Sequence, residues 1–477
     1  MVRIVACISL FTTLIAGCTA EEASDPTSPE QWLAGDHHVH SEFSTGWNRK
    51  VNPPVPKIGG HGAYPISKNA RMAKRHGLSW MVTTDHGGQY HAKINLEQAY
   101  PSVVESRRVV PELIQFYGLE LNAPGADHAG IIVPHTDDEA DRIYQLESQF
   151  DKLDADPNDP GADTIERMVE ALVIMREYSP PPVVIANHPS RFATEGEMYG
   201  RTEPSDIRAW NNAAPEVAVG MAGAPGRQAA SINPDGSART DRVRGNYRGQ
   251  PTYGGFDRMT AEVGGFWDSL LSEGRRWWIT ANSDSHRHWS EGGMDFWPGE
   301  YSKTHVYADH DYSAILEALR GGRVFVTTGD LVSELYVTVS TEDGDATSIG
   351  GTLSVRAGEV VTIVIRVRDP ERVNAHGDSP TVSRVDLIRG YSFEGPSEVE
   401  RNVNSTTSVI RRFDADQWSR NGEFLSMTIR LQETNRDFYV RVRGTSTDQL
   451  EPDPDLPGED PWDDLWFYSN PIAVQVE

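Results

Sequence analysis

Short apolar runs alternate with helix-like segments between residue 35 and about residue 325, and this alternation limits the possible folds more than any other feature. The runs are rich in β-branched and aromatic residues and occupy positions 80–84, 114–117, 183–186 and 277–280. Such runs are typical of parallel strands that are buried on both faces. Helices are expected between them, at positions 66–76, 164–177 and 312–320. This order predicts an α/β fold, either a barrel or a related structure.

The pattern changes near residue 330. Apolar residues then alternate with polar ones at positions 334–339, 360–367, 385–388 and 438–442. A period of two predicts strands with one buried face, and several such strands separated by turns predict an antiparallel β-sandwich. A chain of 477 residues is also too long for one ordinary domain. We therefore expect a barrel at residues 35–329 and a β-sandwich at residues 330–477.

The first residues predict export. One basic residue precedes an apolar stretch at 4–15, and small residues follow it, which is typical of a signal peptide rather than of a spanning helix. The end of this stretch, Leu14-Ile15-Ala16-Gly17-Cys18, resembles a bacterial lipobox. The resemblance implies that residues 1–17 are removed, that the new N-terminal cysteine carries a lipid, and that residues 18–34 form a tether. An ordinary signal peptide is the alternative.

The residue after Cys18 indicates where such a lipoprotein resides. Thr19 follows the cysteine in place of an Asp, which implies the periplasmic face of the outer membrane. The second cysteine of the chain, Cys7, lies in the predicted signal peptide. The mature chain would therefore contain no cysteine pair for an internal disulfide, although export permits disulfides.

The net charge restricts the partners. The chain carries a formal charge of −26, so binding of nucleic acid through a basic face is not expected. An anionic substrate remains possible if bound cations reverse the local field.

Metal-ligating side chains gather where the predicted strands end. His38 and His40 alternate along the first strand, so both imidazoles leave the same face. The later runs are followed by Asp85, His86, Glu120, His128, His188, Asp284 and His286. In a barrel of parallel strands the carboxyl ends meet at one face, so these side chains are expected to converge. A single such His is usually a hydrogen-bonded core residue, but buried His and Asp all need partners, and shared metals would satisfy the whole set.

The motifs stand in a family-specific order. Asp-x-His-x-His-Ser, Thr-Asp-His, Gly-x-Glu, a lone His, His-Pro and Ser-Asp-x-His follow one another within residues 35–290. This order resembles the polymerase and histidinol phosphatase (PHP) superfamily, whose fold is a distorted seven-stranded (β/α) barrel. Residues 321–329 and 469–472 resemble exported PHP proteins with an appended β-sandwich. That subgroup resembles metallohydrolases of the carbaryl hydrolase type as well as phosphoesterases.

The resemblance implies two or three divalent metal ions. A first metal is implied at His38, His40, Glu120 and Asp284, and a second at Glu120, His128 and His188. His86 and His286 would hold a third, but Thr45 stands where the family usually has an Asp, so either His61 or Asp85 replaces it or the site holds only two metals. Asp85 could equally orient an imidazole from outside the metal shell. Nitrogen and oxygen ligands without sulfur suit Mn, Zn or Fe(II).

The expected activity is hydrolysis. A hydroxide bridging two metals would attack a phosphorus or carbonyl centre, with Glu120 and Asp284 as the central carboxylates. Arg191 is the first candidate for binding a phosphate group and Arg227 the second. We expect a small phosphoester substrate, with phosphodiesters favoured over monoesters. A carbamate, ester or amide hydrolase with the same metals is the alternative, and a non-enzymatic scaffold with a surface-binding sandwich is a third possibility.

Overall fold

The computed structural model describes residues 30–477 except 49, 52–54, 155–158, 248, 394–400 and 433. The predicted signal peptide (1–17) and the predicted lipid attachment site, Cys18, lie outside the described residues. Strand β1 (Gln31–Val39) begins within the predicted tether. Leu33 is buried and the ring of Trp32 packs edge-on against Phe325 at 4.7 Å, so these residues belong to the folded body rather than to a tether.

Seven strands follow one another across the N-terminal part of a large mixed sheet. They are β1, β4 (Trp80–Thr83), β5 (Ile114–Asn122), β6 (His128–Ile132), β7 (Val183–Asn187), β8 (Ala218–Ala224) and β9 (Trp278–Ala281). The first three run parallel to one another, and so do the last three. Strand β6 runs antiparallel to both of its neighbours. The sequence pattern did not indicate β6, whereas the predicted strands β4, β5, β7 and β9 all run in one direction, as expected.

The sequence pattern did not indicate β8, because its Gly- and Ala-rich segment is typical of a loop. Gly220 explains the composition: a Cβ at this position would lie 2.2 Å from the main-chain oxygen of Trp278 on β9. Close approach of the two strands thus requires glycine here. The strands that were predicted for this part are confirmed as β1, β4, β5, β7 and β9, with ends that differ by a few residues.

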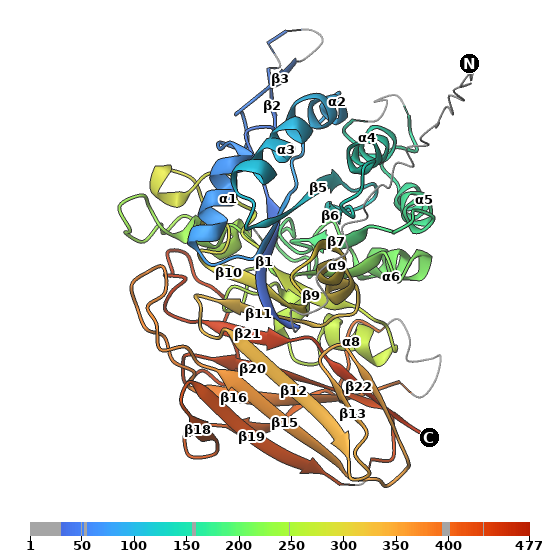
Figure 1. Cartoon of the computed structure of the whole chain (residues 1–477), viewed down its shortest axis with the longest axis vertical. Coiled ribbons are helices and arrows are strands. Elements are labelled where there is room, and N and C mark those ends of the chain that lie inside the picture. Colours follow the sequence, from blue (N-terminus) through green and yellow to red (C-terminus); the bar gives the residue numbers. More distant parts are fainter. Residues whose placement is uncertain are drawn as a thin grey trace, which may run out of the picture.

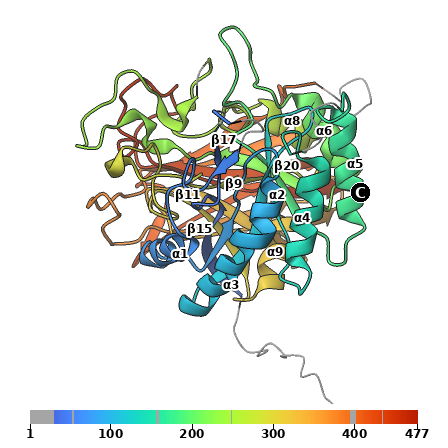
Figure 2. The ribbon, with the colours of Figure 1, turned by 90° about the horizontal axis from the view of Figure 1, so that it is seen from above.

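Helices pack against this part of the sheet. The longer ones are α1 (Ile66–Arg75), α3 (Tyr100–Val109), α4 (Glu139–Phe150), α5 (Ile165–Arg176), α6 (Pro204–Ala213), α8 (Phe266–Ser272) and α9 (Tyr312–Arg320). Shorter helical segments are α2 (His91–Ile94), α7 (Arg258–Ala261), the π-helical η1 (Asn95–Ala99), and the 3-10 turns η2 (Gln228–Ser231), η3 (Arg244–Asn246) and η4 (Trp289–Glu291). The three predicted helices are confirmed as α1, α5 and α9. Figure 1 shows α1 to α6 in one half of the molecule, and Figure 2 shows α4, α5 and α6 along one side. None of the helices in the described ranges has both the length and the apolar character needed to cross a membrane.

The large sheet continues into the C-terminal region. Beyond β1 it adds β10 (Ser302–Ala308), β11 (Val324–Thr328), β21 (Trp466–Ser469), β20 (Phe438–Thr445), β22 (Ile472–Val476), β14 (Thr352–Val355), β16 (Arg384–Tyr391) and β17 (Ser408–Phe413). A separate antiparallel sheet contains β13 (Ala346–Ser348), β12 (Glu334–Thr341), β15 (Val361–Arg368), β19 (Phe424–Leu431) and β18 (Ser419–Asn421). A small hairpin pairs β2 (Gly46–Asn48) with β3 (Val55–Lys57).

The separate antiparallel sheet and the C-terminal part of the large sheet pack against each other through one apolar cluster. Val337 and Ile363 come from the separate sheet, and Leu387 and Val440 come from the large sheet. The four predicted antiparallel strands are therefore confirmed, and the chain is a mixed α/β protein with additional antiparallel sheet. Strand β11 lies before the predicted domain boundary at 329/330 and pairs with β21, which lies after it, so main-chain hydrogen bonds join the two predicted domains. The boundary itself stays a prediction.

The first and last of the seven N-terminal strands approach each other where the ligand motifs lie. Val39 and Ser285 form an isolated parallel bridge, and the main-chain N–H of His40 donates to Ser285 O at 3.0 Å. This contact brings the motif after β9 beside the motif of β1. Since β6 is antiparallel, its first residue, His128, lies at the same edge as the carboxyl ends of β5 and β7.

Candidate metal centre

Glu120, near the end of β5, is the centre of the ligand cluster. Its Oε1 lies 3.0 Å from His38 Nε2, and 3.2 Å from both His128 Nδ1 and His188 Nε2. Its Oε2 lies 3.3 Å from His40 Nε2. One buried carboxylate therefore faces four imidazoles that come from three strand ends, which is the arrangement expected of a ligand shared by two metals.

Asp284, which follows β9, is the second carboxylate of the cluster. Its Oδ1 lies 3.5 Å from His38 Nε2, 3.2 Å from His40 Nε2 and 3.3 Å from His286 Nδ1. Its Oδ2 lies 2.6 Å from Arg191 Nη1. One oxygen of this carboxylate is thus directed at the imidazoles, and the other is held by a cation.

The side chains of the cluster form three groups of potential ligands. They are His38, His40, Glu120 and Asp284; Glu120, His128 and His188; and His40, His86 and His286. Some buried atoms of these groups have no hydrogen-bond partner among the described residues, including His286 Nε2 and His86 Nδ1. Buried polar atoms rarely lack partners. Their convergence, and a donor set of imidazole nitrogens and carboxylate oxygens, fit divalent metal ions.

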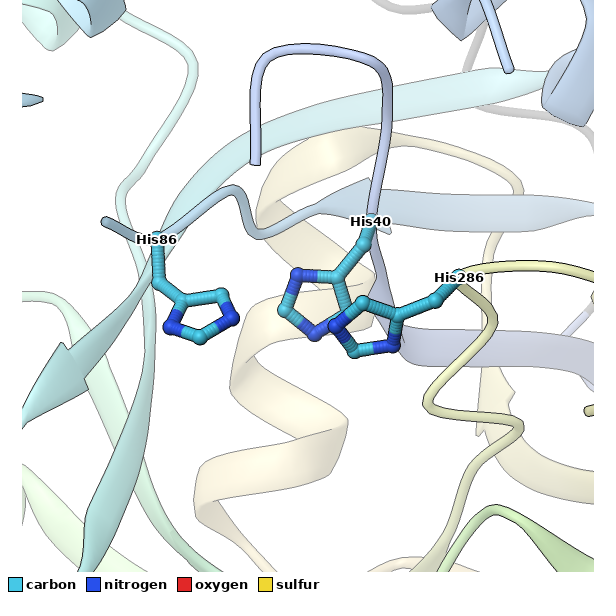
Figure 3. A group of neighbouring side chains, drawn as sticks. All are labelled: His40, His86 and His286. Atoms are coloured by element: carbon cyan, nitrogen blue, oxygen red, sulfur yellow. The ribbon is translucent and has the colours of Figure 1, made fainter. Parts of the chain in front are cut away.

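The third group lies at the more open side of the cluster. Figure 3 shows the rings of His40, His86 and His286, which come from three separate segments of the chain. The rings of His40 and His286 stack with centroids 3.8 Å apart. His61, which is exposed, places Nδ1 2.9 Å from His86 Nε2, whereas the buried Thr45 Oγ1 has no partner among the described residues.

Asp85 does not join any of these groups, which argues against its predicted role as a metal ligand. Its Oδ1 accepts from the Ser41 main chain at 2.6 Å and from Ser44 Oγ at 2.7 Å. Ser41 Oγ donates to its Oδ2 at 2.5 Å. Ser44 Oγ in turn lies 2.8 Å from His40 Nδ1. Three hydrogen bonds thus hold the carboxylate, and through Ser44 it orients the His40 ring, which is the alternative role considered for Asp85.

Two polar residues that the motifs did not single out contact the predicted ligands. Asp127 Oδ2 lies 3.1 Å from His188 Nδ1, and Asn187 Nδ2 donates to Glu120 Oε1 at 3.0 Å. A carboxylate at the far nitrogen of a ligating imidazole fixes its tautomer and raises its basicity. The only sequence signal was position: each residue directly precedes a ligand, His128 or His188.

Replacing Asp127 by Asn is expected to weaken metal binding by about 10–100-fold, because the amide cannot orient and polarise His188 as the carboxylate does. Competition for Mn²⁺ or Zn²⁺ against a coloured chelator measures this affinity. Asp137→Asn, which changes an exposed residue, is the matched control. Equal affinity of Asp127→Asn and the control would contradict the assigned contact.

The charges of the cluster shift its pKa values in opposite directions. Burial alone raises the pKa of Glu120, but His38 and His128 outweigh burial and hold that pKa well below its usual value. Burial alone lowers the pKa of His40, but hydrogen bonds and charges from Asp284 and Glu120 raise it to about 9. Burial alone also lowers the pKa of His128, but the charges of Glu120 and Asp127 raise it to about 9. In the metal-free cluster Glu120 is therefore ionised and His40 and His128 are protonated, whereas burial holds the pKa values of His86 and His286 well below their usual value.

Metal binding is expected to release protons for this reason. A ligating imidazole must be unprotonated, so below about pH 9 a metal displaces the protons of His40 and His128. The apparent affinity should rise with pH up to about that value, and about two protons should leave per loaded centre at neutral pH. Calorimetric titration of Mn²⁺ in two buffers of different ionisation enthalpy counts these protons. Binding without proton release would show that the imidazoles are neutral beforehand.

Three residues at the centre have left-handed backbone conformations. The φ angles are 30° at His188, 48° at Asp284 and 61° at Arg227. Non-glycine residues adopt such angles at a cost of about 1–3 kcal/mol each, and they cluster at functional sites. The fold thus accepts local strain where it directs two ligands and a cation into the cluster.

The two predicted cations differ in access. Arg191 is 1% exposed and donates to Asp284 Oδ2 and to Gly226 O, so its guanidinium is held inside the protein. The side chain of Arg227 is 19% exposed and places Nε 3.2 Å from Asp284 Oδ2. Arg191 is suited to hold Asp284 in place, and Arg227 is the cation that a ligand can reach.

Comparison of the sequence with protein-family models gave no match, and comparison with curated proteins gave none either.

Proposed function

We propose that the protein is a metal-dependent phosphoester hydrolase of the PHP type, with phosphodiesters favoured over monoesters. The observation that carries the proposal is the gathering of eight of the nine predicted metal ligands into one buried cluster around Glu120. The residues at this cluster suit two or three divalent cations, Mn, Zn or Fe(II). The finer architecture proposed with it is a distorted barrel of β1 and β4 to β9.

The side chains of the cluster have separate roles in this proposal. Bound divalent cations supply Lewis acidity and lower the pKa of a coordinated water. Glu120 and Asp284 hold the cations, and Arg191 keeps one Asp284 oxygen directed at the cluster. Asp127 holds the His188 ring, and the network of Asp85, Ser44 and His40 holds the opposite side. Arg227 faces the incoming substrate and neutralises its negative charge.

We further propose that the chain is exported and anchored to the periplasmic face of the outer membrane through lipid on Cys18, with no nucleic acid partner. Support comes from the lipobox-like segment and from the net charge of −26. Globomycin, which blocks lipoprotein signal cleavage, should retain the longer precursor if the proposal holds. A Cys18→Ser chain that still partitions into detergent would oppose the lipid anchor.

The experiment that tests the activity uses protein from Thr19 onward, loaded separately with Mn²⁺, Zn²⁺ and Fe²⁺. Hydrolysis of an aryl phosphodiester, an aryl phosphomonoester and an aryl carbamate is compared, with Asp284→Asn as control. Metal-dependent phosphodiester cleavage that is lost in the control is the expected result.

A carbamate, ester or amide hydrolase is the second candidate. It is favoured by the burial of Arg191, because only one of the two predicted cations then remains for an anionic substrate. Carbamate turnover without phosphoester turnover would establish this candidate and refute the first.

A further inference from the structure

Arg227 lies at the edge of the metal centre, and part of its guanidinium is available to donate hydrogen bonds to a ligand. Its Nε contacts Asp284, but none of the described residues accepts a hydrogen bond from its two terminal nitrogens. The guanidinium is partly exposed and lies beside a cluster that is suited to cations. A planar guanidinium with free donors in such a place is well suited to bind an oxyanion.

The loop that carries Arg227 is held at its main chain by a second segment. The N–H of Gly245 donates to Arg227 O at 3.1 Å, and Arg227 N donates to Ser283 O at 3.3 Å. Arg244, next to Gly245, is completely buried. Its Nε lies 3.4 Å from Gln228 Oε1, and its Nη2 donates to Tyr301 Oη at 2.7 Å. The position of Arg227 therefore depends on where Arg244 is fixed.

An acidic loop from the C-terminal region fixes Arg244. Asp464 pairs with Arg244 Nη1, and Asp455 and Glu459 place an oxygen 3.6 Å and 3.5 Å from the same atom. Asp455 Oδ2 also accepts from the Gly255 main chain at 3.0 Å. These three acids are close enough together to hold a cation, but the guanidinium of Arg244 already lies among them.

We propose that the acidic loop, residues 453–464, acts through Arg244 to position Arg227, and that Arg227 binds the negatively charged oxygens of the substrate. This inference rests on the proposed function and narrows it to substrates that are anionic beside the scissile bond. Arg244, Asp455 and Asp464 are positioning residues, and Arg244 precedes the two acids by more than 200 positions in the sequence. A guanidinium held in place before binding loses less entropy when the anion arrives.

A double-mutant cycle on the Mn²⁺-loaded protein tests the inference, with the affinity for inorganic phosphate measured by calorimetry. Arg227→Ala is expected to weaken phosphate binding by about tenfold or more, since charge-assisted hydrogen bonds are lost. Asp464→Asn should weaken it by about fivefold in the wild-type background, but should have almost no effect in the Arg227→Ala background. Asp463→Asn, in the same loop but exposed, should leave the affinity unchanged.

The metal content of each variant is measured alongside, so that loss of metal is not mistaken for loss of anion binding. If Asp464→Asn does not fold, Tyr301→Phe replaces it in the cycle, because this change removes only the hydroxyl between Arg244 and Pro461 O. Equal weakening in both backgrounds would overturn the positioning role, and phosphate affinity that is unchanged in Arg227→Ala would overturn the anion role. Phosphate binding that depends on Arg227 in a protein that cleaves no phosphoester would support the inference and refute the proposed activity.

Discussion

Replacing Glu120 by Gln is expected to remove at least one metal per chain and to lower metal-dependent hydrolysis by about 1,000-fold or more, since an essential member of a catalytic metal centre is lost. Among the described residues, Glu120 is the one carboxylate that contacts ligands of both the first and the second predicted metal site. The amide has nearly the same size, but it is neutral and a poor ligand for divalent cations. Metal analysis after gel filtration and hydrolysis rates measured on the same sample check both parts of the prediction.

The matched control is Glu112→Gln, which makes the same chemical change at an exposed position. It should keep the metal content and rate of the unmodified protein. Thermal unfolding in the presence of a chelator separates metal loss from misfolding, because the metal-free form of Glu120→Gln should still unfold cooperatively. Full metal content in Glu120→Gln would mean that Glu120 does not bridge the two sites.

The largest expected loss of stability comes from a buried ion pair between α8 and β20. Asp268 and Arg441 are both completely buried. Arg441 donates Nε to Oδ1 at 2.9 Å and Nη2 to Oδ2 at 2.8 Å. Replacing Asp268 by Ala leaves the guanidinium without its counter-charge in the interior, which costs about 3–5 kcal/mol. Urea unfolding of the metal-free protein is the measurement, with the shift in midpoint as the readout.

An exposed pair provides the comparison. Arg356 Nη2 lies 3.0 Å from Asp343 Oδ2, and the side chains are 79% and 65% exposed. Arg356→Ala should change the free energy of unfolding by less than about 1 kcal/mol, because solvent screens such pairs. Similar destabilisation by Asp268→Ala and Arg356→Ala would show that the buried pair does not join α8 to the C-terminal strands.

The sequence alone was sufficient for most of the ligand cluster. His38 and His40 share one face because strand side chains alternate, and Glu120, His188 and Asp284 each lie at or just after the end of an apolar run. Local patterns of this kind also predicted helices α1, α5 and α9 and the antiparallel strands β12, β15, β16 and β20. These features depend on the period of apolar residues over a few turns or pleats, which the sequence displays directly.

Only the tertiary structure determined the strand directions, side-chain roles and exposures that depend on contacts between distant segments. The antiparallel direction of β6 places His128 at the ligand edge, and Gly220 belongs to a strand only because β9 lies against it. Asp85 is engaged by serines near His40, more than 40 positions earlier in the sequence. Arg191 and Arg227 look alike in the sequence, yet one is buried against Asp284 and the other is open to a ligand. Pairing partners and burial arise from the packing of the whole chain, whereas a residue's own neighbours determine only its local conformation.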